Sequence, residues 1–140
     1  MNNRPRWFTV VAVIALLWNL AGVFAIFANL SLSAEQIAGL PKDQQALHAA
    51  RPSWSVAGSV LAVIAGSAGC IFLLLRKRWA LWAFYASLVG IVLQDIGLFV
   101  IAAAVQSPGT AVVAMQAMVL LIAVALLLLT RKAVAQSWLA

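Results

Sequence analysis

The stretch LVGIVLQDIGLFV, residues 88–100, places an amide and a carboxylic acid side by side in an otherwise apolar run. A charged aspartate near the centre of a bilayer costs about 2.5 to 3.5 kcal/mol on insertion scales, so it should face protein or water. An acid beside an amide in such a setting can bind a proton, a cation or a polar solute. Gln94 and Asp95 are therefore the first candidates for a functional site.

The other long apolar runs each contribute a polar side chain at a similar depth. At a rise of about 1.5 Å per residue, Asn19 lies near the middle of its run. The polar residues of the other three runs lie in the half of each run nearest residues 31–52. Trp18 could supply an aromatic platform for a sugar. We predict one polar cluster lining a cavity, made of Asn19, Gln94, Asp95, Gln116, Trp18 and Ser59. Hydrogen bonding between helices is the alternative role, above all for Gln116 and Ser59, and a structural hydrogen bond is the alternative for Asp95.

Residue types that perform catalysis are scarce. The chain has three acidic residues, one histidine (His48), one tyrosine and one cysteine (Cys70). It has no carboxylates paired at helical spacing, no histidine or cysteine cluster that could bind metal or haem, and no glycine-rich phosphate loop. A single cysteine forms no internal disulfide. We therefore expect no enzymatic activity, no metal site and no cofactor.

The composition predicts the elements that must position the polar cluster. Hydrophobic residues make up 66% of the 140 residues, charged residues 9%, and the mean hydropathy is +1.07, which is typical of an integral membrane protein. Runs of about 20 apolar residues span a bilayer. Four occur, at 7–30, 53–75, 79–105 and 111–130. We predict a single all-α membrane domain over 1–140, an antiparallel four-transmembrane-helix bundle with a short helical external loop at 31–52 and a tail at 131–140.

The basic residues cluster beside the predicted spans. They precede the first span, join the second to the third, and follow the fourth: Arg4, Arg6, Arg76, Lys77, Arg78, Arg131 and Lys132. The positive-inside rule then predicts that both termini are cytoplasmic. Such short clusters favour lipid headgroups as neighbours. They do not form the folded basic face that binds nucleic acid.

The loop at 31–52 has its own helix signals. Ser33 and Gln36 fit a capping box, and Gly39 can end that turn. Pro41 suits the first position of a second helix, and Pro52 stops it. We predict two short helices across the outer end of the bundle.

Small residues recur on one face of several predicted helices, where they allow close approach in lipid. The set is Gly22, Gly58, Ala62, Gly66, Gly69, Gly90 and Gly97. Gly90 and Gly97 lie roughly opposite Asp95 on the third span. Because one small face suffices for packing inside the bundle, this second face predicts a homodimer.

Several segments together resemble a known group of proteins. They are LLWNLAGV (16–23), LPKDQQALHAARPSW (40–54), GSAGCIFLLLRKRWA (66–80), Gln94 and the closing SWLA. This pattern is similar to that of small bacterial four-helix membrane proteins commonly labelled sugar transporters. The resemblance covers nearly the whole chain, and the group tends to have an aromatic residue where His48 stands. It implies a multi-pass protein of the bacterial inner membrane.

Three functions are compatible with these features. The first is a transporter or permease for a small polar solute, with Asp95 as a proton or cation partner. The second is an accessory subunit that packs against a larger membrane complex. The third is a binder of lipid or another hydrophobic ligand. The partners expected are the bilayer and either a second copy or a larger membrane protein, and the sequence names no substrate.

Overall fold

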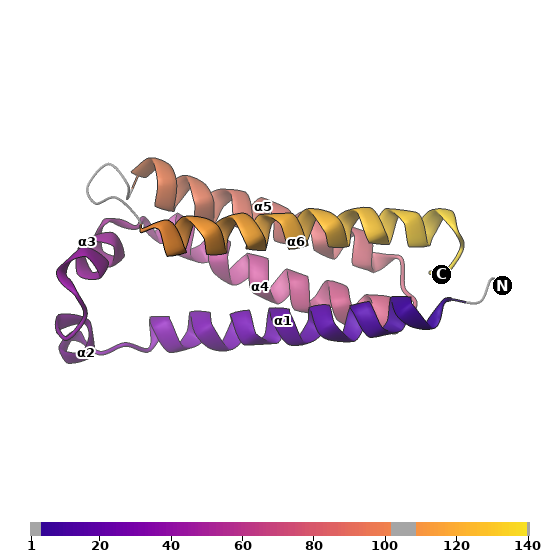
Figure 1. The fold of residues 1–140 in the computed structure, drawn as a ribbon, viewed down its shortest axis with the longest axis horizontal. Helices are drawn as coiled ribbons and strands as arrows, with labels where there is room; N and C mark the ends of the chain where they lie inside the picture. The colour runs from indigo at the N-terminus through magenta and orange to yellow at the C-terminus, as the bar shows by residue number, and fades with distance from the viewer. Residues whose placement is uncertain (1–3, 102–108, 140) are drawn as a thin grey trace.

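The computed structural model describes residues 4–101 and 109–139. Over these residues it is all-helical, with no strand. The long helices are α1 (Arg6–Leu30), α4 (Ser53–Leu74), α5 (Trp79–Asp95) and α6 (Thr110–Ala135), and α5 continues as a π-helix, η1 (Ile96–Ile101) (Figure 1). Four helical segments are long and apolar enough to cross a membrane. The prediction of an all-α chain with four such segments is confirmed, and it indicates a multi-pass membrane protein.

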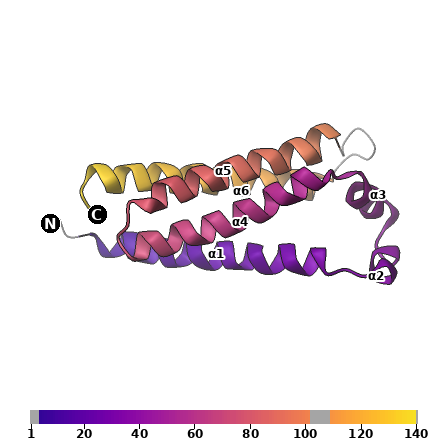
Figure 2. The ribbon, with the colours of Figure 1, turned by 180° about the vertical axis from the view of Figure 1, so that it is seen from behind.

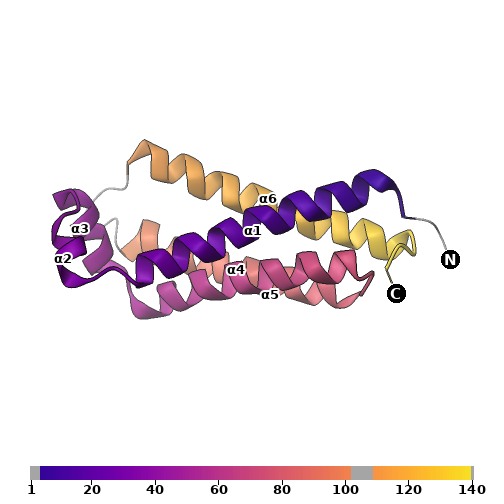
Figure 3. The ribbon, with the colours of Figure 1, turned by 90° about the horizontal axis from the view of Figure 1, so that it is seen from below.

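The long helices lie side by side along the longest dimension of the molecule (Figures 1 and 2). The contact between α4 and α5 is the most extensive, followed by those of α1 with α4 and of α5 with α6. Contacts between α1 and α6 are far fewer. These two helices diverge toward the end that carries the short helices, as Figure 3 shows. One side of the molecule is therefore open between α1 and α6.

Helix boundaries agree with the sequence to within one residue except in two places. The helix α6 continues to Ala135, five residues beyond the predicted end at Thr130. Hydropathy falls at Arg131 and Lys132, but both are good helix formers and nothing there breaks the helix. In the third predicted span, the α-helical geometry ends at Asp95. The predicted end of that span, at residue 105, lies outside the described residues.

The outer loop forms the two predicted short helices, α2 (Ala34–Ala38) and α3 (Lys42–Ala50). The capping box is present: the Gln36 backbone N–H donates to Ser33 Oγ at 3.1 Å, and the Ser33 N–H donates to Gln36 Oε1 at 2.8 Å. Gly39 ends α2 as predicted. Pro41 is the cap residue before α3 rather than its first residue, a shift of one position.

A second contact fastens the loop to the first long helix. Arg51, which follows α3, donates from Nη2 to the Asn29 side-chain oxygen at 3.1 Å. Burial lowers the pKa of the Arg51 guanidinium. The end of the loop, just before α4, is therefore held against the end of α1.

The helices α4 and α5 approach closely because small residues face each other. A Cβ added at Gly90 would lie 2.5 Å from the Gly58 carbonyl oxygen and 2.7 Å from the Ala62 nitrogen. A Cβ at Gly97 would overlap Ser55, and a Cβ at Gly58 would lie 2.7 Å from Leu93 Cβ. Only glycine leaves room for such a backbone contact.

This packing removes the argument from which a homodimer was predicted. Gly90 and Gly97 face α4 within the chain and do not form a second, unused small face. Helical periodicity identified the face correctly but could not tell which helix covers it. The homodimer itself stays a prediction.

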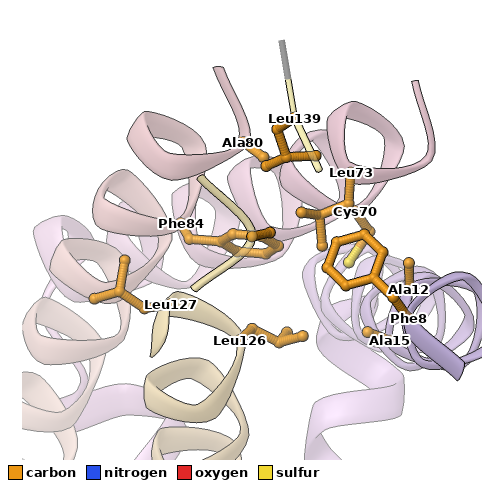
Figure 4. Close-up of a cluster of buried hydrophobic side chains, with 11 residues drawn as sticks. Phe8, Ala12, Ala15, Cys70, Leu73, Ala80, Phe84, Leu126, Leu127 and Leu139 are labelled. Carbon is orange, nitrogen blue, oxygen red and sulfur yellow. The ribbon is translucent and has the colours of Figure 1, made fainter. Parts of the chain in front are cut away.

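The end of the molecule opposite the short helices contains a cluster of buried hydrophobic side chains. Phe8 is fully buried, and its ring lies 5.4 Å from that of Trp138 (Figure 4 shows the surrounding cluster). Leu139 is also buried. In the segment predicted as a cytoplasmic tail, at 131–140, the first five residues extend α6, and Trp138 and Leu139 pack onto the bundle.

This return of the chain depends on a strained residue. Ser137 has φ = 60°, and the Trp138 N–H donates to the Ala133 carbonyl at 2.9 Å, which together form a Schellman motif. A left-handed conformation costs a non-glycine residue roughly 1 kcal/mol. We expect Ser137→Gly to raise the free energy of unfolding by about 1 kcal/mol. Chemical unfolding in micelles would measure this, with the exposed Gln136→Gly as control, where we expect destabilisation. Equal effects of the two changes would contradict the explanation.

Candidate functional site

A cavity of about 320 Å³ lies between α1, α4, α5 and α6. Its wall is mainly apolar, with side chains such as Ile91, Met115 and Val119. Its polar lining comes from several helices: Trp18 and Asn19 on α1, Ser87 and Gln94 on α5, and Gln116 on α6. A small number of polar groups in an apolar wall is the usual form of a small-molecule site.

A pair of amides bridges two helices at this cavity. Gln94 Nε2 donates to Gln116 Oε1 at 2.5 Å. The backbone at Gln94 is held from the other side, because Ser55 Oγ on α4 donates to the Gln94 carbonyl at 3.2 Å. The position of Gln94 is therefore fixed by contacts with both α4 and α6. The pair can offer its remaining amide groups to a ligand.

Asn19 contributes a third amide from α1. Its Nδ2 donates to the Ala15 carbonyl at 2.8 Å and approaches Cys70 Sγ at 3.7 Å. Its Oδ1 lies over Gly66, in the space that a Cβ at that position would fill. Gly66 thus makes room for the Asn19 amide between α1 and α4.

Two members of the predicted cluster do not line the cavity. Ser59 is buried and donates to the Ser55 carbonyl of its own helix at 3.3 Å. Asp95 is half-buried, and its Oδ1 is inaccessible and has no hydrogen-bond partner. One residue rotates a side chain by about 100° around a helix, which turns Asp95 away from the cavity wall, although the Gln94 side chain lies close enough to hydrogen-bond its carboxyl group. Trp18, Asn19, Gln94 and Gln116 do come together.

Sequence reasoning missed Ser87, which lines the cavity. Its Oγ donates to the Ala62 carbonyl at 2.7 Å, across the contact between α5 and α4. Ser87, Ile91 and Gln94 follow the i, i+4, i+7 spacing of one helix face. Extending that spacing back from Gln94 would have found Ser87.

None of the residues that line the cavity, among those the structure describes, carries a formal charge. Amides, a hydroxyl and an indole can exchange hydrogen bonds with an uncharged polar group. They cannot neutralise an ion removed from water, which is expensive to bury without a counter-charge. The cavity therefore favours uncharged ligands.

No protein-family model, curated protein or solved structure matches this chain. The cavity and its lining must therefore be interpreted from their own chemistry.

The basic residues at the other end make a separate feature. Arg4 donates from its guanidinium to the Leu73 carbonyl at 2.5 Å and to that of Leu74 at 3.4 Å, at the end of α4. Burial, and secondarily the nearby Arg76, lowers the pKa of Arg4. The ammonium of Lys132 lies 5.8 Å from the ring of Trp7. Among the other residues predicted to lie near lipid headgroups, Arg76 is half-buried. The remaining four are exposed: Arg6, Lys77, Arg78 and Arg131.

Proposed function

We propose that the protein is a transporter or permease-like protein that binds a small uncharged polar solute in the cavity between its four long helices. The observation that carries the proposal is the convergence of three amides, from Asn19, Gln94 and Gln116, in one uncharged cavity. Amides recognise hydroxyl and carbonyl groups without requiring charge. The resemblance to proteins labelled sugar transporters agrees with such a solute.

The proposal includes the setting of the molecule. The four apolar segments form an antiparallel transmembrane bundle in a bacterial inner membrane, with the short helices outside and both termini in the cytoplasm. The distribution of basic residues supports this orientation. In that frame the Gln94–Gln116 pair lies in the outer half of the bilayer.

The proposed function does not use Asp95 as a proton or cation partner. Its carboxylate is not part of the cavity wall, and it belongs to a half-buried residue whose Oδ1 has no partner. Recognition is instead assigned to Asn19, Gln94 and Gln116.

The test is solute flux into proteoliposomes, followed by light scattering after an osmotic step. We expect faster entry of an uncharged polyol such as xylitol than into empty liposomes, and no acceleration for gluconate. The double change Gln94→Met and Gln116→Met keeps side-chain length but removes both amides, and should reduce the protein-dependent flux at least tenfold. That factor corresponds to about 1.4 kcal/mol.

The matched control is Ser59→Ala, which changes a buried polar group that does not line the cavity. It should leave the flux unchanged. If the doubly changed protein transports as well as the original, or if no solute of the polyol class enters faster than into empty liposomes, the proposal is wrong.

An accessory role is the second candidate, and one observation favours it. The helices α1 and α6 carry large exposed apolar side chains, such as Phe24 and Leu121 at 79% and 69% exposure. A helix of a larger membrane protein could cover them. Recovery of the chain from native membranes mainly in a complex with a larger partner, together with absence of flux, would support this role instead.

A further inference from the structure

We propose that the cavity also takes a neutral single-chain amphipath, whose polar head occupies the cavity and whose hydrocarbon tail lies in the groove between α1 and α6. A monoacylglycerol is an example of this chemistry. The inference rests on the proposed function in that it uses the same cavity and its amides, and it adds a second class of molecule that the cavity takes.

The first observation is a second groove that joins the cavity. It also measures about 320 Å³ and lies between α1 and α6. Trp18, Ile122 and Leu126 line both spaces. The two spaces therefore lie next to each other at these three residues, and together they form one feature on the open side of the molecule.

The second observation is the change of polarity along this feature. The added part is lined by aliphatic side chains such as Val11, Ile14 and Leu129, and among the described residues Trp18 alone brings a polar atom to it. The amide pair stands at the other end, at Gln94 and Gln116. A ligand that fills both parts needs one hydrogen-bonding end and one apolar end, because burying a polar group without a partner costs free energy.

The dimensions agree with one extended chain. From Gln116 to Leu129 the helix α6 rises about 20 Å, at about 1.5 Å per residue. This is close to the length of a common fatty-acyl chain.

The absence of charge in the lining determines the head group. Among the described lining residues of both spaces, none is basic or acidic. An ionised fatty acid or a phospholipid phosphate would enter the cavity without a counter-charge. A hydroxyl or ester head can instead exchange hydrogen bonds with the amides.

The experiment uses a monoacylglycerol with a dibrominated stearoyl chain, added to the full-length protein in micelles. Bromine atoms quench a tryptophan that they touch. The fluorescence of Trp18 is obtained as the difference between the fluorescence of the original protein and that of Trp18→Phe. We expect saturable quenching of the Trp18 component, and at least tenfold weaker binding of ionised dibromostearic acid at pH 9.

Two further variants separate the ends of the ligand. Ala125→Phe fills the groove without touching the amides, and should weaken quenching at least tenfold. Val124→Phe adds the same ring beside it, on a side chain that lines neither space, and should leave quenching unchanged. The double change of Gln94 and Gln116 to methionine should also weaken binding about tenfold.

The outcomes are distinct from those of the flux test. Xylitol flux that persists in Ala125→Phe, with no saturable quenching in the original protein, would overturn the amphipath and leave the permease. Saturable quenching without flux would support the amphipath while the permease fails. The inference would be overturned if the ionised acid bound as tightly as the monoacylglycerol. It would also be overturned if quenching were lost because a second copy covers the groove in a dimer.

Discussion

Gly90→Ala should lower the free energy of unfolding by about 3 kcal/mol, although the change adds only one methyl group. The new Cβ would meet backbone atoms, 2.5 Å from the Gly58 carbonyl oxygen and 2.7 Å from the Ala62 nitrogen. Backbone atoms cannot rotate away as a side chain does, so α4 and α5 must separate by about 1 Å to restore van der Waals distances. The higher helix propensity of alanine returns only about 1 kcal/mol.

Separation of α4 from α5 also weakens two hydrogen bonds that flank Gly90. One joins Ser87 to the Ala62 carbonyl, and the other joins Ser55 to the Gln94 carbonyl. Since the second holds Gln94 in place, ligand binding should fall together with stability.

Unfolding of the protein in micelles by a denaturing detergent would measure the effect. The matched control is Gly39→Ala in the outer loop, where a Cβ would lie at an ordinary contact distance of 3.4 Å from the Gln36 carbonyl oxygen. It should change stability by less than about 0.5 kcal/mol. If Gly90→Ala is as stable as Gly39→Ala, α4 and α5 do not make the close contact described.

Asp95→Leu should have the opposite effect and raise the free energy of unfolding by about 2 kcal/mol. The Oδ1 atom of Asp95 is buried and has no partner. On insertion scales a central aspartate and a central leucine differ by about 3 kcal/mol, and the half-buried position of Asp95 reduces the difference. Leucine has the same number of side-chain heavy atoms with the same branching, and its larger methyl groups bring no polar atom to this position.

The stability should be measured in bilayers or bicelles, where hydrocarbon surrounds the helix. Asp95→Asn separates charge from shape, because asparagine keeps the size of the side chain and is neutral. We expect Asp95→Asn to keep the flux of the original protein. A large loss of flux in Asp95→Asn would show that Asp95 belongs to the functional site. If Asp95→Leu is less stable than the original protein, the carboxylate has a stabilising contact.

The fold was predictable where local chemistry decides it. The capping box at Ser33 and Gln36 specifies its own hydrogen bonds, so the start of α2 was predicted correctly. Hydropathy located four long helices because their apolar runs are nearly uninterrupted. The end of α6 was missed because a charge ends an apolar run but does not end a helix.

The candidate site was predictable only in part, because depth along a helix does not determine direction around it. Asn19, Gln94 and Gln116 were found at a common depth and do line one cavity. Asp95 was grouped with them because it is adjacent in sequence, yet adjacent residues point about 100° apart. Which face meets which helix depends on the tertiary packing, as the contact of Gly90 with α4 shows.

The sparse contact between α1 and α6 has a consequence for handling the protein. Three helix pairs make most of the contacts between the long helices, and α1 meets α6 and the chain after it at one end, in the cluster around Phe8 and Trp138. Toward the short helices, the boundary between α1 and α6 is left to the surrounding fluid. Hydrocarbon chains then pack against these helix faces as part of the folded structure, as well as acting as its solvent. Extraction into a short-chain surfactant should let the first and last helices shift relative to each other, and adding back long-chain lipid should restore their spacing.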